Sequence, residues 1–127
     1  MTNLDVANRF FNGLLAGDRA ELEAVFAPGA TFWQNFAGTM QQREDFLPAF
    51  ASLARIVSDL HFEDVRRTGT PGGFVEQHSL CGVTRSGEQL AVRGCFVGTV
   101  ADGQITAIEE YLDSVQLAPL GIGRPQS

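Results

Sequence analysis

The feature that most constrains the fold is a long stretch of alternating apolar and polar residues that begins at Val57 and continues to Val115. Alternation with a period of two indicates β-strands that bury one face. Three Gly-containing segments interrupt it, each with the composition of a tight turn: 70–73, 86–87 and 102–103. This half of the chain therefore predicts four antiparallel strands in a meander. They run from 57 to the first turn, then over 74–84, 89–101 and 104–115.

In the first half of the chain, apolar residues recur with helical spacing and predict helices at 3–16, 18–26 and 43–55. Thr2 followed by Asp5 is a candidate cap for the first helix. Pro48 lacks a backbone N–H, so the third helix must either start later or bend. Between the second and third helices, the aromatic segment 30–36 predicts a strand. Its core face carries Ala30, Phe32, Gln34 and Phe36.

Together these elements predict an α+β fold in which a strongly curved antiparallel sheet wraps around three N-terminal helices. Gly82, Gly94 and Gly98 interrupt the predicted strands and allow the curvature. A sheet curled in this way and closed by a helix forms a cone with an apolar cavity, a common form of small-molecule pocket. We expect the tail, 119–127, to lie over the surface or against a partner.

The composition limits the class of protein. The chain has 127 residues, of which 44% are hydrophobic, and its formal net charge is -6. The length fits a single domain spanning 1–127, and the charge argues against nucleic acid or an anionic membrane as a partner. No apolar segment reaches the roughly 20 residues that a membrane span requires. No signal-peptide pattern is found at the N-terminus, so we expect a cytoplasmic protein.

The two cysteines, Cys81 and Cys95, do not have the spacing of a metal-ligand motif, and two cysteines do not make a disulfide framework. We expect both to be small buried hydrophobic residues. The sequence therefore predicts neither a metal site nor a cofactor.

Three segments resemble the nuclear transport factor 2-like superfamily, in its SnoaL-like and limonene epoxide hydrolase-like branch. They are FFNGLLAGDRAELEAVFAPGATF, WQN and DGQITAIEEYLD. The resemblance covers nearly the whole chain and implies the cystatin-like cone of that superfamily, which includes polyketide cyclases, isomerases and dehydratases. It also implies a homodimer formed through the outer face of the sheet. For this surface the last strand offers Thr106, Ile108, Glu110 and Leu112.

The residues of the epoxide hydrolase site carry over only in part. Those enzymes hold a nucleophilic water with a Tyr, an Asn and an Asp. Asn35 and Asp113 match the last two, whereas Trp33 replaces the Tyr. On the strand after the first turn of the meander, Glu76 and His78 replace an Arg and an acidic Asp. The acid/base set of this chain therefore differs from that of the epoxide hydrolases.

These side chains favour general acid/base chemistry. Asp113 is the candidate base with a protonated His78 as the acid; alternatively a neutral His78, oriented by Asp113 or Glu76, is itself the base. Two carboxylates that share an apolar site acquire different pKa values, so the presence of Glu76 near Asp113 strengthens this hypothesis. The predicted catalytic residues are Asp113, His78 and Asn35. The predicted substrate-binding residues are Trp33, Glu76, Tyr111, Phe50 and Phe96.

The predicted function is that of a cofactor-free enzyme acting on an apolar small molecule, as an epoxide hydrolase, polyketide cyclase, isomerase or dehydratase. Two alternatives remain open. One is a domain that binds a small ligand without turnover, and the other is a dimeric structural domain.

Whether His78 and Asp113 meet depends on the strand register. With two-residue turns at both Ser86-Gly87 and Asp102-Gly103, the two side chains face opposite sides of the sheet. We therefore expect one extra residue, in a three-residue loop or a β-bulge, that brings them to the same side.

Overall fold

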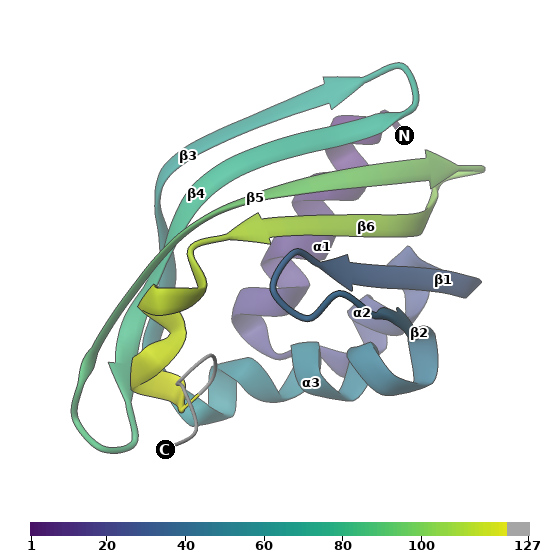
Figure 1. Cartoon of the computed structure of the whole chain (residues 1–127). Helices are drawn as coiled ribbons and strands as arrows, with labels where there is room; N and C mark the ends of the chain where they lie inside the picture. The colour runs from purple at the N-terminus through teal and green to yellow at the C-terminus, as the bar shows by residue number, and fades with distance from the viewer. Residues whose placement is uncertain (122–127) are drawn as a thin grey trace.

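The computed structural model describes residues 1–121, and Figure 1 shows how its helices and strands are arranged. Three α-helices, α1 (Asn3–Ala16), α2 (Arg19–Val25) and α3 (Arg43–Ile56), lie on one face of a curved sheet. The sheet has six strands in the order β2-β1-β6-β5-β4-β3. The strands are β1 (Phe26–Gln34), β2 (Met40–Gln42), β3 (Val57–Thr70), β4 (Gly73–Thr84), β5 (Gln89–Ala101) and β6 (Gln104–Leu112). The predicted α+β fold is confirmed.

The sheet is mixed rather than wholly antiparallel. β3 to β6 form the predicted antiparallel meander and β2 pairs antiparallel with β1, but β1 lies parallel to β6. Parallel neighbours need a long connection, and here everything from β2 to β5 lies between the two strands in the sequence. β1 also begins at Phe26 rather than at residue 30, with irregular pairing to β6 between Phe26 and Thr31.

The helix ends lie close to their predicted positions because local capping residues determine them. The Thr2 hydroxyl accepts a hydrogen bond from the Asp5 N–H, and the Asp5 carboxylate accepts one from the Thr2 N–H. Gly17 ends α1 in the left-handed conformation, with φ of 63°. Pro48 lies inside α3, which nevertheless starts at Arg43, so the predicted alternative of a later start is wrong. Among the described residues, no helix is long and apolar enough to cross a membrane.

The last strand ends at Leu112 rather than at Val115, because the chain turns there into a short 3-10 helix, η1 (Ser114–Leu120). Asp113 caps η1 by accepting a hydrogen bond from the Val115 N–H at 3.1 Å. Leu117 of η1 is buried against the sheet. The predicted tail thus packs on the fold as far as it is described, and residues 122–127 lie outside the described residues.

β3 carries two irregularities that bend the sheet. Its pairing with β4 shifts register on either side of the segment 61–63. Asp59 and Asp64 lie at these shifts in the left-handed conformation, with φ of 54° and 53°. Bulges of this kind increase local twist and curvature, and in Figure 1 β3 and β4 bend around the helices.

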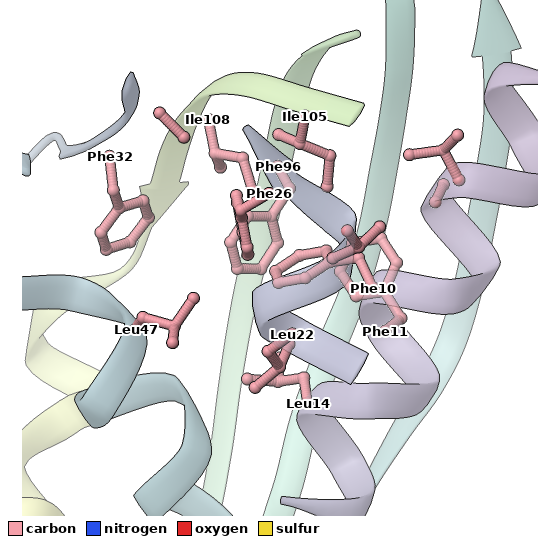
Figure 2. Close-up of a cluster of buried hydrophobic side chains, with 14 of the residues drawn as sticks. Phe10, Phe11, Leu14, Leu22, Phe26, Phe32, Leu47, Phe96, Ile105 and Ile108 are labelled. Carbon is pink, nitrogen blue, oxygen red and sulfur yellow. The ribbon is translucent and has the colours of Figure 1, made fainter. Parts of the chain in front are cut away.

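Aromatic side chains fill the space between the helices and the concave face of the sheet (Figure 2). Phe10 and Phe11 of α1 are fully buried. Their ring centroids lie 5.3 Å from Phe26 of β1 and 5.5 Å from Phe96 of β5, respectively. Phe46 of α3 lies 5.0 Å from Phe26. These edge-to-face contacts hold the helices against the sheet.

Gly98 of β5 lies beneath the ring of Phe74, and we expect Gly98→Ala to be destabilising. A β-carbon at this position lies 2.3 Å from two ring carbons of Phe74, which is fully buried. Overpacking of a core position costs about 1–3 kcal/mol, so the free energy of unfolding should fall by that amount in urea denaturation. Gly29→Ala is the control, because its β-carbon meets no atom within 4 Å. Equal effects of the two substitutions would contradict this packing.

Candidate active site

A cavity of about 260 Å³ lies between the concave face of the sheet, α3 and η1. Its wall is largely apolar, and Leu117 and Leu120 contribute from η1. The polar side chains that line it are Gln34, Gln41, His78 and Glu110. The apolar wall includes Phe32, Phe46, Phe50, Phe62, Leu80, Val92, Phe96 and Leu112. The cavity therefore offers a few polar groups in an apolar enclosure, which is typical of small-molecule sites.

Two separate offsets in strand register decide which side chains reach this cavity. The loop between β4 and β5 spans 85–87, with Gly87 left-handed at φ of 86°. A β-bulge early in β6 then shifts its pairing with β5 by one residue. As a result His78, Gly94 and Leu112 form one row across three strands. Either offset alone would put His78 and Asp113 on the same face, but the two together put them on opposite faces.

The predicted pairing of His78 with Asp113 is therefore wrong. His78 faces the cavity, whereas Asp113 lines a shallow pocket on the outer face of the sheet together with Asn35 and Tyr111. The side chain of Asp113 is exposed and caps η1. The physical reason is that the extra residue, expected once, occurs twice.

Asn35 has a structural role in the place of the predicted catalytic one. Its side-chain amide donates to the Leu112 carbonyl and its Oδ1 accepts from the Leu112 N–H, both at 3.2 Å. The side chain thereby continues the pairing of β1 with β6. Trp33 and Tyr111 pack against each other on the outer face, with ring centroids 5.3 Å apart. None of these three side chains lines the cavity.

The other predicted residues lie in or beside the cavity. Phe50 and Phe96 line it, which is the position that a substrate-binding role requires. Glu76 lies on the same face of β4 as His78, is fully buried and contacts His78. It therefore supports the site without lining it.

Glu110 of β6 is the only carboxylate among the described residues that lines the cavity. Its Oε1 accepts a hydrogen bond of 2.6 Å from Nε2 of Gln34, its neighbour on β1. Burial raises the pKa of the Glu110 carboxyl from 4.5 to about 7, and the Gln34 hydrogen bond acts in the opposite direction. Near neutral pH, Glu110 therefore populates both its protonated and its ionised form.

His78 of β4 faces the same cavity and is held from behind by Glu76. Its Nδ1 lies 2.7 Å from Oε2 of Glu76. The other Glu76 oxygen, Oε1, accepts a hydrogen bond from Nε of Arg67, which also donates through Nη1 to Asn8 at 2.8 Å. An ionised Glu76 beside Arg67 can only accept hydrogen bonds, so Nδ1 of His78 carries the proton. Nε2, which bonds to none of the described residues, remains to act on a ligand.

Aromatic packing fixes the plane of the His78 ring. The ring stacks on Phe62 with centroids 4.1 Å apart and planes 24° apart. Phe11 and Phe96 contact it at 5.9 and 5.4 Å. The Arg67 guanidinium in turn lies 4.6 Å above the Phe11 ring. Packing and hydrogen bonding thus determine one orientation for the imidazole.

His78 and Glu110 approach the cavity from two strands with β5 between them. Their partners on β5, Gly94 and Phe96, occupy successive positions of the same face. With strands about 4.8 Å apart and a rise of about 3.4 Å per residue, the two Cα atoms lie roughly 12 Å apart. Gly94 has no side chain to fill the space between them. A small molecule in the cavity can therefore contact both groups.

The sequence prediction misses Glu110 and Gln34 as site residues. It assigns Glu110 to a dimer surface with Thr106, Ile108 and Leu112. Ile108, however, is 1% exposed and Leu112 lines the cavity, so these two residues and Glu110 between them face inward. The apolar neighbours two residues before and after Glu110 are the signal that identifies its face. For Gln34, the alternation of 30–36 already predicts the core face.

A family model for the SnoaL-like domain matches residues 7–108. The chain belongs to the SnoaL-like domain family. This family lies within the NTF2-like superfamily, as the three sequence segments predict. A search of curated protein sequences gives no match.

Several solved structures share the fold at low sequence identity. IdmH from Streptomyces antibioticus, a proposed polyketide cyclase, has a TM-score of 0.79 and 19% identity, covering 96% of this chain and all of that one. A proposed polyketide cyclase from Pseudomonas putida has a TM-score of 0.78 and 16% identity, covering 91% of this chain and 95% of that one. An NTF2-like protein from Burkholderia xenovorans has a TM-score of 0.75 and 21% identity, covering 91% of this chain and 92% of that one.

The raised pKa of Glu110 predicts how pH affects stability. Below about pH 4.5 the carboxyl is protonated in both states and contributes no difference. Between 4.5 and about 7 the unfolded chain has lost the proton that the folded chain retains, so stability falls as pH rises. Above about 7 the loss is complete and amounts to roughly 3 kcal/mol. Glu110→Gln removes this loss, so its stability relative to wild type should rise between pH 5 and pH 8 in urea denaturation. Glu109→Gln, on the outer face, is the matched control, and the same rise there would contradict the assignment.

The pairing of Arg67 with Glu76 predicts a second stability effect. Arg67→Met leaves a fully buried carboxylate without its cation, which costs about 3–5 kcal/mol. The double variant Arg67→Met with Glu76→Gln should recover much of this loss, because the neutral amide no longer needs the cation. Arg66→Met, at the adjacent exposed position, should have little effect. Thermal and urea unfolding of wild type, Arg67→Met, Glu76→Gln and the double variant measures the coupling between the two side chains, and additive effects would argue against it.

Proposed function

We propose that this protein is an enzyme that transfers protons on a small, largely apolar carbonyl compound, with His78 and Glu110 as its acid/base pair. The observation that carries the proposal is that these two side chains face one apolar cavity from neighbouring rows of the sheet. Glu110 titrates near neutral pH, and Glu76 orients His78. Isomerisation and ring closure are the reaction types that this pair serves.

In the proposed reaction, Nε2 of neutral His78 removes a proton from the carbon next to the carbonyl group. Protonated Glu110 donates a proton to the carbonyl oxygen, so an enol forms. In an unsaturated ketone the enol is conjugated with the C=C bond. Return of the proton from His78 to the far carbon of this dienol, and of the enol proton to Glu110, moves the C=C bond and restores both groups. If the enol carbon instead attacks a second carbonyl of the same molecule, a ring closes and the new alkoxide takes the proton from His78. The first carbonyl re-forms as its oxygen returns its proton to Glu110, so both groups are restored.

The groups behind the pair stabilise the charge that this reaction creates. When His78 accepts a proton, the imidazolium lies 2.7 Å from the Glu76 carboxylate. Arg67 holds Glu76 in place from the other side. Because the surrounding wall is apolar, these charges interact more strongly than they would in water.

The cavity sets the size and character of the substrate. An apolar cavity of about 150 Å³ is known to hold a benzene molecule. A cavity of about 260 Å³ has room for one or two rings with short substituents. The carbonyl oxygen belongs near Glu110, and the apolar remainder packs against Phe50 and Phe62.

The structural neighbours support this proposal, since two of those named above are proposed polyketide cyclases. Epoxide hydrolysis is favoured less, because Asn35 and Asp113 lie on the opposite face from the cavity. Binding of a ligand without turnover is the second candidate, because an apolar wall alone suffices for it.

Turnover and its pH dependence test the proposal. We expect a screen of unsaturated ketones and short polyketide mimics to find a substrate whose kcat falls as pH rises through about 7, where Glu110 loses its acid form. Glu110→Gln and His78→Gln should each lower kcat by about 10²–10⁴-fold, and Glu110→Gln should remove this pH dependence. Asp113→Asn, on the outer face, should leave turnover unchanged.

Each contrary outcome has a distinct meaning. A kcat that rises through pH 7 would make Glu110 the base and reverse the two roles. Ligands that bind in calorimetry but are never converted would favour the binding domain. Turnover that survives both Glu110→Gln and His78→Gln would reject the site.

A further inference from the structure

The outer face of the sheet carries a second cluster of reactive side chains, behind the wall of the cavity. His61 and Glu63 lie on β3, and Cys81 pairs directly with His61 across to β4. A ring nitrogen, a carboxylate oxygen and the thiol sulfur of these residues lie within 4.8 Å of one another. The proposed catalysis uses none of the three.

Hydrogen bonding determines which nitrogen of His61 faces the cluster. Nδ1 lies 2.6 Å from the backbone carbonyl oxygen of Asp59, which can only accept, so Nδ1 carries the proton. The carboxylate of Asp59 is more distant, at 3.9 Å. In the neutral ring Nε2 then has a lone pair, and it lies 2.8 Å from Oε2 of Glu63. Two lone pairs at this distance require a proton or a metal ion between them.

A metal-binding histidine usually donates the N–H of its other ring nitrogen to a carbonyl or carboxylate, as Nδ1 of His61 does to the Asp59 carbonyl. The left-handed conformation of Asp59 occurs at the β3 bulge just before His61. Cys81 is a free cysteine whose Sγ makes a long contact of 3.7 Å with the Ser79 carbonyl. A proton between His61 and Glu63 would account for the contact of those two side chains alone. A metal ion would also use the nearby thiol of Cys81, as a third ligand.

We propose that His61, Glu63 and Cys81 bind a zinc ion, with a fourth coordination position open to solvent. A mixed set of nitrogen, oxygen and sulfur donors suits zinc, and tetrahedral zinc separates its ligand atoms by roughly 3–4 Å. The three ligand atoms already lie within 4.8 Å of one another, so zinc binding requires only a small adjustment of their positions. Sequence spacing does not reveal the site, because the ligands meet across two strands.

The ion joins β3 to β4 directly behind the cavity. Phe62, which lies between the two β3 ligands in sequence, packs on the other side of the sheet and stacks on the His78 ring at 4.1 Å. Zinc binding therefore holds in place the strand segment against which the catalytic imidazole packs.

Cobalt spectroscopy on chelator-treated protein tests the site. We expect one equivalent of Co²⁺ to produce a near-ultraviolet thiolate-to-cobalt absorption band, which Zn²⁺ removes by competition. The band should disappear in Cys81→Ser and persist in Cys95→Ser, the control that leaves the other cysteine unchanged. His61→Gln and Glu63→Gln should each weaken Zn²⁺ binding by at least about tenfold in a chelator competition assay.

Glu63→Gln keeps the test decisive if Cys81→Ser fails to fold, because Glu63 is exposed. Absence of a thiolate band in the wild type would overturn the proposal, as would a band that survives Cys81→Ser. Zn²⁺ affinity unchanged in both His61→Gln and Glu63→Gln would overturn it as well. Cobalt bound elsewhere, for example at His78, has no thiol ligand there and gives no such band.

Discussion

Backbone hydrogen bonding between β4, β5 and β6 decides which side chains face the cavity, and the chemistry of the protein depends on it. Side chains alternate strictly along each strand, so the pairing of one residue assigns the face of every other. The row that contains Phe96 places Glu76 and Glu110 on the concave face. The next row places His78 there, with Gly94 leaving room beside it. The helices and η1 enclose the cavity but do not determine which side chains of the sheet face it.

The two carboxylates of that row illustrate how environment divides one residue type into two roles. Glu76 is fully buried and contacts both Arg67 and His78, so its role is to orient the imidazole. Glu110 is bonded to the neutral amide of Gln34, and burial therefore raises its pKa to about 7. The carboxyl group held by Arg67 thus has a positioning role, and the carboxyl group beside a neutral amide is the one that exchanges protons near physiological pH.

Local signals in the sequence predict most of the fold. The Thr2–Asp5 capping box and Gly17 define α1, and the alternation with its Gly turns gives the four strands of the meander. The parallel pairing of β1 with β6 is not encoded locally and escapes prediction. The site depends on register, where an error of one residue reverses a face. The assignment of His78 to the cavity holds because alternation within its own strand determines its side. The assignment of Glu110 to the outer face fails because it follows from placing Asp113 in the cavity, although Ile108 and Leu112 on either side of Glu110 indicate the inward face.

The bulge in β6 has a consequence for comparing this chain with its homologues. A homologue that has one residue more or fewer between the bulge and the end of this strand would turn Glu110 outward and present its neighbours to the cavity instead. Alignment by residue identity does not register that change, because the Tyr-Leu-Asp ending would still match. To assign the equivalent active-site carboxylate in another member of the family, one should therefore compare the length of this strand first and the identity of its residues second.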